Sequence, residues 1–367
     1  MCELVDRGEP DGGKAMKSCP EHLLDEIEAD PKPWVVSRNR ENYDRFLNLL
    51  LDLSYPNVHP TQIRGWRRRA HETWALQDSL ISENCTGGAE NGEIISAIGA
   101  LPISQRILYV HSGAMRHTLK AAAALFAATH RTFDVMEQFP ALEYWMGQYK
   151  YRSRFVTSWQ RPTSFSIPDQ IEIEEVGVYP LRLGSSATRE CLQLAPATER
   201  DLESLSDTHK RFAAMLLDTP QVFAHLYTLQ AYSVLRKGDS QVAVALVGES
   251  PDEFTAFNVF NSVFVIPLKE ADLEPSSVDA LRSCEQLKGK VLRVLTHGRA
   301  STYQWHMADC QLVPTFIVLT PRSQLNLFRR SLKDAFLPLL DKYPDVELAR
   351  LLGEVDKESG AVSGGSR

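Results

Sequence analysis

The pattern of hydrophobic and polar positions in the first half of the chain predicts helices separated by short strands. Apolar residues recur at helical spacing in 40–53 and 61–81, whereas 106–110 is a short apolar run typical of a strand. The alanine-rich stretch 114–130 and the amphipathic stretch 133–149 predict two more helices. The glycine-containing stretch 85–92 predicts a loop. This half is therefore expected to be rich in helix.

The second half predicts a more even mixture of strands and helices. Residues 171–178 begin by alternating apolar and charged side chains, as in a strand with one wet face. Gly238-Asp239 lies between two apolar runs and is typical of a β-hairpin. Further strands are predicted at 191–195, 231–236, 241–247, 256–267, 291–296 and 313–320, and helices at 198–217, 220–229, 276–288, 301–311 and beyond 321. The pattern predicts an α/β or α+β protein with mixed sheets flanked by helices.

The length of 367 residues predicts one large or two medium domains. Residues 181–188 contain Gly184 and two neighbouring serines, and they are the expected domain junction. We expect a flexible acidic leader at 1–33, a helix-rich α/β domain at 34–188, a mixed α+β domain at 189–356 and a flexible tail at 357–367.

Composition narrows the class of protein. Hydrophobic residues make up 43% and charged residues 24%, as in folded globular chains. A net charge of −7 makes nucleic acid an unlikely partner. The richest apolar run, 121–128, is far shorter than the roughly 18 residues of a membrane span. The six cysteines are scattered without a CxxC pair, and no signal peptide opens the chain, so we expect a soluble cytoplasmic protein.

One candidate site lies at His111-Ser112-Gly113, between the strand at 106–110 and the helix predicted from Ala114. In the simplest interpretation Ser112 caps that helix. In a second interpretation Ser112 is the nucleophile of a serine hydrolase, presented on a sharp strand-to-helix turn, with His225, His297 or His306 as its base. In a third, the amides of Ser112 and Gly113 hold an anion beside Arg116.

A second candidate site is the basic cluster of Arg64, Arg67 and Arg68, which lies next to Trp66 along the chain. Guanidinium groups beside an indole suit phosphates and a stacked base. Together with Ser112, Gly113 and Arg116, this cluster predicts a non-catalytic regulatory or interaction protein that binds a small anionic ligand, a nucleotide or a protein partner. A solvated helix face explains the same three arginines.

A metal site is a weaker interpretation. His306 and Cys310 are four residues apart on a predicted helix, which places two possible ligands on one face. A surface histidine and a buried thiol explain the same pair, so no metal is expected.

The order of elements from 192 to about 320 is strand, two helices, hairpin, long strand, helix, strand, helix and strand. This order resembles that of GNAT-type acyl-CoA N-acyltransferases, and the opening stretch 192–205 is similar to the first strand and helix of many such domains. The resemblance implies a mixed α/β fold, acetyl-CoA or another acyl-CoA as cofactor, and either an acyltransferase or a catalytically degenerate relative.

The family binds the acyl-CoA pyrophosphate on a loop of the type Arg/Gln-x-x-Gly-x-Gly/Ala after its fourth strand. At the corresponding place, 267–276 has no glycine and contains carboxylates, so that loop is not intact. The stretch 177–187 is similar to the same loop and implies cofactor binding in the N-terminal domain, and the C-terminal domain then becomes a degenerate copy. The cofactor-binding residues implied in this way are Arg182, Gly184, Ser185 and Ser186. By the same resemblance, Tyr303 is the proton donor to the departing thiolate.

Overall fold

The protein is described by a computed structural model that covers the middle of the chain with gaps. The described residues are 45, 48–49, 84–90, 93–102, 104–115, 119–150, 167–180, 192–218, 228–236, 240–249, 262–269, 273–287, 290–298, 307 and 310–342.

Eleven described strands form one mixed sheet in the order β1-β2-β3-β4-β11-β5-β10-β9-β8-β7-β6. Strands of both halves of the chain therefore share a single sheet. The strands are β1 Asn84–Glu90, β2 Glu93–Pro102, β3 Ile107–Met115, β4 Tyr144–Lys150, β5 Ile171–Pro180, β6 Leu192–Pro196, β7 Thr228–Arg236, β8 Ser240–Glu249, β9 Ser262–Pro267, β10 Val291–Thr296 and β11 Cys310–Pro321.

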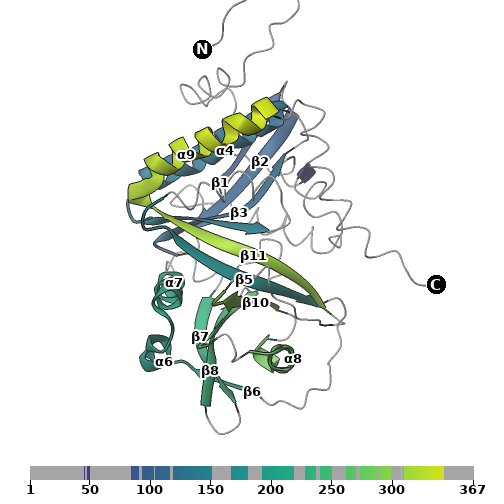
Figure 1. The fold of residues 1–367 in the computed structure, drawn as a ribbon, viewed down its shortest axis with the longest axis vertical. Helices are drawn as coiled ribbons and strands as arrows, with labels where there is room; N and C mark the ends of the chain where they lie inside the picture. The colour runs from purple at the N-terminus through teal and green to yellow at the C-terminus, as the bar shows by residue number, and fades with distance from the viewer. Residues whose placement is uncertain are drawn as a thin grey trace, which may run out of the picture.

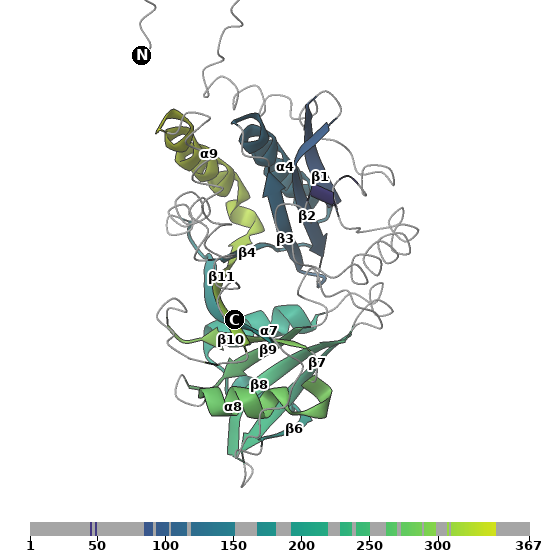
Figure 2. The same ribbon diagram turned by 90° about the vertical axis from the view of Figure 1, so that its right-hand side faces the viewer.

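The described helices lie on both faces of this sheet (Figures 1 and 2). None of the helices in the described part is long and apolar enough to cross a membrane. The helices are α4 Leu119–Gln138, α6 Glu199–Glu203, α7 Asp207–Leu217, α8 Pro275–Arg282 and α9 Leu325–Lys342, with single 3-10 turns at Glu285–Leu287 and Arg322–Gln324.

The two halves repeat one succession of elements. In the N-terminal half the antiparallel pair β2–β3 leads through α4 to β4, which is parallel to β3. In the C-terminal half the antiparallel pair β8–β9 leads through α8 to β10, which is parallel to β9. A parallel pair needs such a crossover, because a short turn cannot return the chain to the same end of the sheet. Each half thus contains one β-α-β unit.

The halves are joined by an exchange of strands at the centre of the sheet. The C-terminal strand β11 lies between β4 and β5, and the N-terminal strand β5 lies between β11 and β10, all in antiparallel pairs. In Figure 1, β5 and β11 cross the middle of the molecule side by side. Each half therefore completes the sheet of the other.

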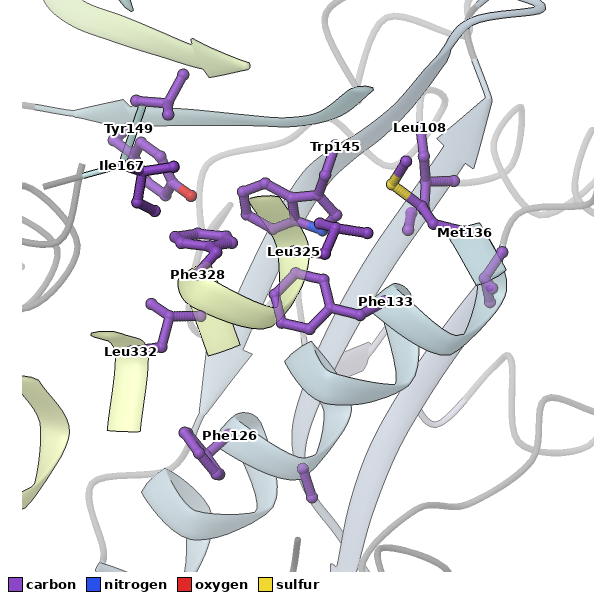
Figure 3. Packing of buried hydrophobic residues seen from close by; sticks show 14 of the residues in the cluster. Leu108, Phe126, Phe133, Met136, Trp145, Tyr149, Ile167, Leu325, Phe328 and Leu332 are labelled. Atoms are coloured by element: carbon purple, nitrogen blue, oxygen red, sulfur yellow. The ribbon is translucent and has the colours of Figure 1, made fainter. Parts of the chain in front are cut away.

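One face of the sheet is covered by α4 and α9 over the N-terminal strands and by α8 over the C-terminal strands. In the core under α4 and α9, Phe133, Trp145 and Phe328 pack ring against ring (Figure 3). The buried indole nitrogen of Trp145 donates a hydrogen bond to Thr132 Oγ1 at 2.9 Å. The side chains of this core come from β2, β3, α4, β4, β11 and α9, so the last described helix closes the N-terminal half.

The opposite face is covered by α7, which bridges the halves. Phe212 of α7 is fully buried in a cluster that includes Tyr109 of β3, Ile173 of β5 and Phe264 of β9. The backbone amide of Gln105 also donates to the carbonyl of Asp218, just after α7, at 2.9 Å. A helix from the second half thus packs beneath strands of both.

A buried ion pair lies in the same layer. Glu175 of β5 and Arg293 of β10 are 0% and 1% exposed, and the guanidinium donates from Nε at 3.0 Å and from a terminal nitrogen at 2.9 Å. Thr315 of β11 donates to the same carboxylate at 2.5 Å, and Arg293 lies over the ring of Phe264 at 4.3 Å from its centroid. The pair ties β5 to the C-terminal half by charge as well as by main-chain hydrogen bonds.

The predicted α/β class and most predicted strands are confirmed. The predicted hairpin is formed by β7 and β8, which pair antiparallel from Arg236 and Ser240 onward, and β10 occupies the predicted range 291–296. Other predictions of elements are wrong. Residues 84–90 form β1 instead of a loop, 144–150 form β4 instead of the end of a helix, and the predicted helix 198–217 is interrupted. That interruption ends at Ser206, whose hydroxyl caps α7. The domain boundary near 188 stays a prediction.

Replacing the buried carboxylate tests the role of the ion pair. Glu175→Gln keeps the shape but leaves Arg293 as an uncompensated buried charge, so the free energy of unfolding should fall by about 3 to 5 kcal/mol. The control is Glu203→Gln, which removes an exposed ion pair with Lys210 and should cost far less, because solvent screens the two charges. Urea unfolding measures both. Equal, small losses would contradict a stabilising role for the buried pair.

Candidate acyl-CoA site

The parallel strands β3 and β4 pair over only four residues and then separate. Their last pair is Val110 and Gly147, yet β3 continues to Met115 beside β2, and β4 continues to Lys150 beside β11. Figure 1 shows β1, β2 and β3 spreading away from β11 and β5. Beyond the last pair, main-chain groups of β4 that face β3 are placed to pair with an extended ligand. We call the point of separation at Val110 and Gly147 the apex.

The helix that follows β3 begins close to this opening. Only three residues separate β3 from α4, which starts at Leu119, runs for 20 residues and has no acidic residue in its first turn. The amide dipoles at a helix N-terminus favour an anion, and a nearby carboxylate would oppose it. Ala121 in this first turn is fully buried, so the backbone packs closely there. This end of α4 suits a phosphate.

The sequence across this junction matches the family loop better than the place predicted for it. Arg116-x-x-Leu119-x-Ala121 has the arginine and the alanine of Arg/Gln-x-x-Gly-x-Gly/Ala, with leucine in place of the first glycine. Sequence reasoning missed this match because it began the helix at Ala114, which left no loop. Arg116 itself lies outside the described residues. The residue pattern alone was the signal that could have found it.

At the apex, the face covered by α4 is closed. A Cβ added to Gly147 would overlap the ring of Tyr149, so glycine is what allows that ring to fold back along β4. Tyr149 is buried and packs on Phe316 of β11 with ring centroids 5.3 Å apart. Burial raises the pKa of its hydroxyl far above the usual range, so the phenol stays protonated.

The opposite face of the apex carries a polar side chain that is only partly buried. Gln148 is the first residue of β4 beyond the last pair with β3. Its Oε1 accepts a hydrogen bond from the hydroxyl of Tyr109 on β3 at 2.6 Å. Its Nε2 donates to Glu175 and lies 3.4 Å from Thr315 Oγ1. A chain of hydrogen bonds therefore connects the apex to the buried ion pair.

In the C-terminal half, a hydrogen bond joins the parallel strands β9 and β10 just beyond their last pair. The last β9–β10 pair is Val265 and Val294. Just beyond it, the ring Nε2 of His297 lies 2.8 Å from the carbonyl oxygen of Pro267, which accepts the hydrogen bond. The following helix α8 has eight residues, with Glu274 at its N-cap and a proline in its first turn. A carboxylate and a missing amide both oppose a phosphate there.

A buried histidine, His209, packs against His297. His209 of α7 is 5% exposed, and its ring meets that of His297 with centroids 4.9 Å apart. Burial first, and then the charge of His297, lowers the pKa of His209 to about 4. Burial also lowers the pKa of His130 on α4 to about 4, with help from Arg329 and Lys333. Both imidazoles are neutral at pH 7.

The prediction of a strand-to-helix turn at His111-Ser112-Gly113 is wrong. Ser112 and Gly113 lie inside β3, where Ser112 pairs with Gly99 of β2, and the strand runs to Met115. Ser112 therefore neither caps α4 nor occupies a nucleophile elbow. The antiparallel pairing of β3 with β2 continues to Met115, and it outweighs the helix preference of the residues after Ser112.

Other predicted site residues lie outside the described part of the chain. These are Arg64, Arg67, Arg68, Arg116, Arg182, Gly184, Ser185, Ser186, Tyr303 and His306. Cys310 is described, and it opens β11 instead of lying on the predicted helix, so it does not share a helix face with His306. Among described residues, no three His, Cys, Asp or Glu side chains gather as a metal site.

Comparison with known proteins gives structural matches only. No protein-family model matches this chain, and no curated protein does. A GCN5-related N-acetyltransferase from Sphaerobacter thermophilus matches 78% of this chain and 95% of its own, at 8% identity and a TM-score of 0.43. A tandem GNAT protein from the clavulanic acid biosynthesis pathway matches 78% and 98%, at 7% and 0.37. A GNAT-family acetyltransferase from Colwellia psychrerythraea matches 78% and 98%, at 9% and 0.29. All three bear the name of the family that the element order resembles.

The packing of Tyr149 over Gly147 can be tested by one added methyl group. Gly147→Ala should lower the free energy of unfolding by about 1 to 3 kcal/mol, because the buried ring has nowhere to move. In the matched control, Gly177→Ala places a methyl against Tyr179, which is only partly buried and can turn outward, so the loss should be smaller. Chemical denaturation compares the two variants. The reverse order would show that Tyr149 is not held at the apex.

The two neutral histidines predict a loss of stability in mild acid. Their native pKa values of about 4 lie below the ordinary 6.5, so between these limits the unfolded chain binds protons that the folded chain does not. Between pH 7 and 5 each imidazole should lower the free energy of unfolding by about 2 kcal/mol. His209→Gln and His130→Gln should each flatten that dependence in urea titrations. An unchanged slope in either variant would mean that its imidazole is charged in the folded protein.

Proposed function

We propose that the chain is an acyl-CoA-dependent N-acyltransferase whose cofactor site lies between β3 and β4. The observation that carries this proposal is the β3-α4-β4 unit, in which the parallel strands separate after four pairs and the helix begins beside the opening. The C-terminal unit has the same order but is tied by His297, so the N-terminal unit is the better cofactor site.

The residues of this unit divide the binding of the cofactor between them. The first-turn amides of α4, with Arg116 ahead of them, would hold the pyrophosphate. Main-chain groups of β4 from Gln148 to Lys150 would pair with the amides of the pantetheine arm, as a strand edge pairs with an extended peptide. Leu119 stands where the family pattern has its first glycine. The residues otherwise fit the group.

Acyl-CoA, when bound, supplies an acyl group as a thioester. Transfer to an amine forms a C–N bond and breaks the C–S bond, while one proton leaves the nitrogen and one is taken up by the departing thiolate. The contribution of this protein would be to hold the two reactants together at the apex. Tyr303 stays the proposed proton donor to the thiolate.

Binding can be tested by thermal shift with acetyl-CoA, CoA, GTP and UTP. Acetyl-CoA and CoA at 100 times their Kd should add about 2.7 kcal/mol of stability, and the two nucleotides should add none. Arg116→Glu should abolish the shift, whereas Arg182→Glu should keep it. The opposite result for these two variants would place the pyrophosphate loop after β5, and a shift with GTP or UTP alone would favour the regulatory alternative. Thiol release from acetyl-CoA in the presence of amines then separates an active enzyme from a degenerate relative.

A further inference from the structure

We infer that the side-chain carbonyl of Gln148 is the subsite that receives the acceptor amine, in its neutral form, at the apex between β3 and β4. This inference rests on the proposed function. It names a group that recognises the second substrate, which neither the sequence pattern nor the family resemblance supplied.

The first step of the argument concerns direction of approach. On the α4 side of β4, Tyr149 and the aromatic core under α9 close the apex. Side chains alternate along a strand, so Gln148 projects from the other face, as its bonds to Tyr109 and Glu175 confirm. Gln148 is partly exposed, whereas Tyr109 is 1% exposed. A nucleophile that approaches a thioester between these strands on the α7 side therefore meets Gln148, whose side chain is partly exposed.

The second step concerns the orientation of the Gln148 amide. Glu175 forms a buried salt bridge with Arg293, and a carboxylate in such a pair accepts hydrogen bonds and does not donate them. The amide nitrogen of Gln148 must therefore face Glu175, and the amide oxygen must face Tyr109. A buried charge pair on β5 and β10, three and four strands from β3, thus sets which end of the glutamine side chain is offered to a ligand.

The third step concerns the remaining bonding capacity. An amide oxygen has two lone pairs, and within the described residues Tyr109 supplies the one donor to Gln148 Oε1. The second lone pair suits an N–H donor and cannot serve a carboxylate or phosphate oxygen. The charges of Glu175 and Arg293 cancel, so this buried pair offers no net negative charge to an ammonium ion. The site fits an uncharged amine, which is also the nucleophilic form.

The network also limits what Glu175 can do. Its carboxylate accepts from Arg293 twice, from Thr315 and from Gln148. With its oxygens engaged and its charge matched by a buried guanidinium, it orients Gln148 and does not take the proton of the amine. Gln148 is therefore a substrate-positioning residue, and Glu175 acts only through it.

The test uses the full chain, acetyl-CoA and three primary amines without a carboxylate: butylamine, benzylamine and spermidine. Gln148→Met keeps the length of the side chain and removes its hydrogen bonds. The KM for the amine should rise about tenfold, as expected for one lost hydrogen bond, while the Kd for acetyl-CoA changes less than about twofold. Thiol release measures the first quantity, and isothermal titration measures the second.

Gln170→Met is the matched control. Gln170 is also partly buried, and it donates one side-chain hydrogen bond, to Thr320 at 2.8 Å, away from the apex. This variant should leave both constants unchanged, and its melting temperature shows what losing such a bond costs the fold. Tyr109→Phe should raise the amine KM by a smaller factor, because it frees the Gln148 oxygen while loosening its orientation.

The outcomes separate this inference from the proposed function. A Gln148→Met variant with unchanged constants, or with equal losses for acetyl-CoA and amine, overturns the subsite and leaves the acyltransferase intact. Binding of acetyl-CoA without transfer to any of the three amines also overturns the subsite. A wild-type chain that neither binds acetyl-CoA nor releases thiol overturns both proposals.

Discussion

The buried ion pair of Glu175 and Arg293 lies where a strand of one half enters the sheet of the other. Removing two charges from water is costly, and here the carboxylate keeps its hydrogen bonds through Thr315 and Gln148 while the guanidinium lies on Phe264. A slip of β5 by one residue would turn Glu175 to the opposite face of the sheet, away from Arg293. The pair therefore fixes the register of the exchanged strands as well as their order.

That register in turn positions the apex. Because β11 is held between β4 and β5, β4 is bound on one side along its whole length and is free to part from β3 on the other. The C-terminal unit has the same elements, but its parallel strands are joined just past their last pair by His297 and Pro267. The same β-α-β topology therefore leaves the parallel strands apart in one half and joined by a hydrogen bond in the other, and a few side chains make this difference. This is consistent with function residing in sites and not in folds.

Local patterns predicted an element correctly where the residues fit a helix or a strand but not both. The run Val291–Thr296 is apolar apart from Arg293 and Thr296, and it forms the strand predicted. The stretch that became β4 was ambiguous, because Trp145 and Tyr149 are four residues apart, a spacing that shares a face on a helix and on a strand alike. Ser112 was misplaced because the alanines after it favour helix, whereas pairing with β2 extends the strand.

The sequence by itself determined the class of fold and several strands of the second half, since both are written in residues close along the chain. Sequence reasoning missed the arginine-bearing pattern from Arg116 to Ala121, because only the structure shows that β3 continues to Met115 and that α4 begins at Leu119. The tertiary structure decided which strands exchange, which way Gln148 faces and which parallel pair is tied. Glu175 and Arg293 are 118 residues apart, and Thr315 and Glu175 are 140 apart. Contacts over such separations leave no local periodicity, because they depend on how the whole chain pairs its strands.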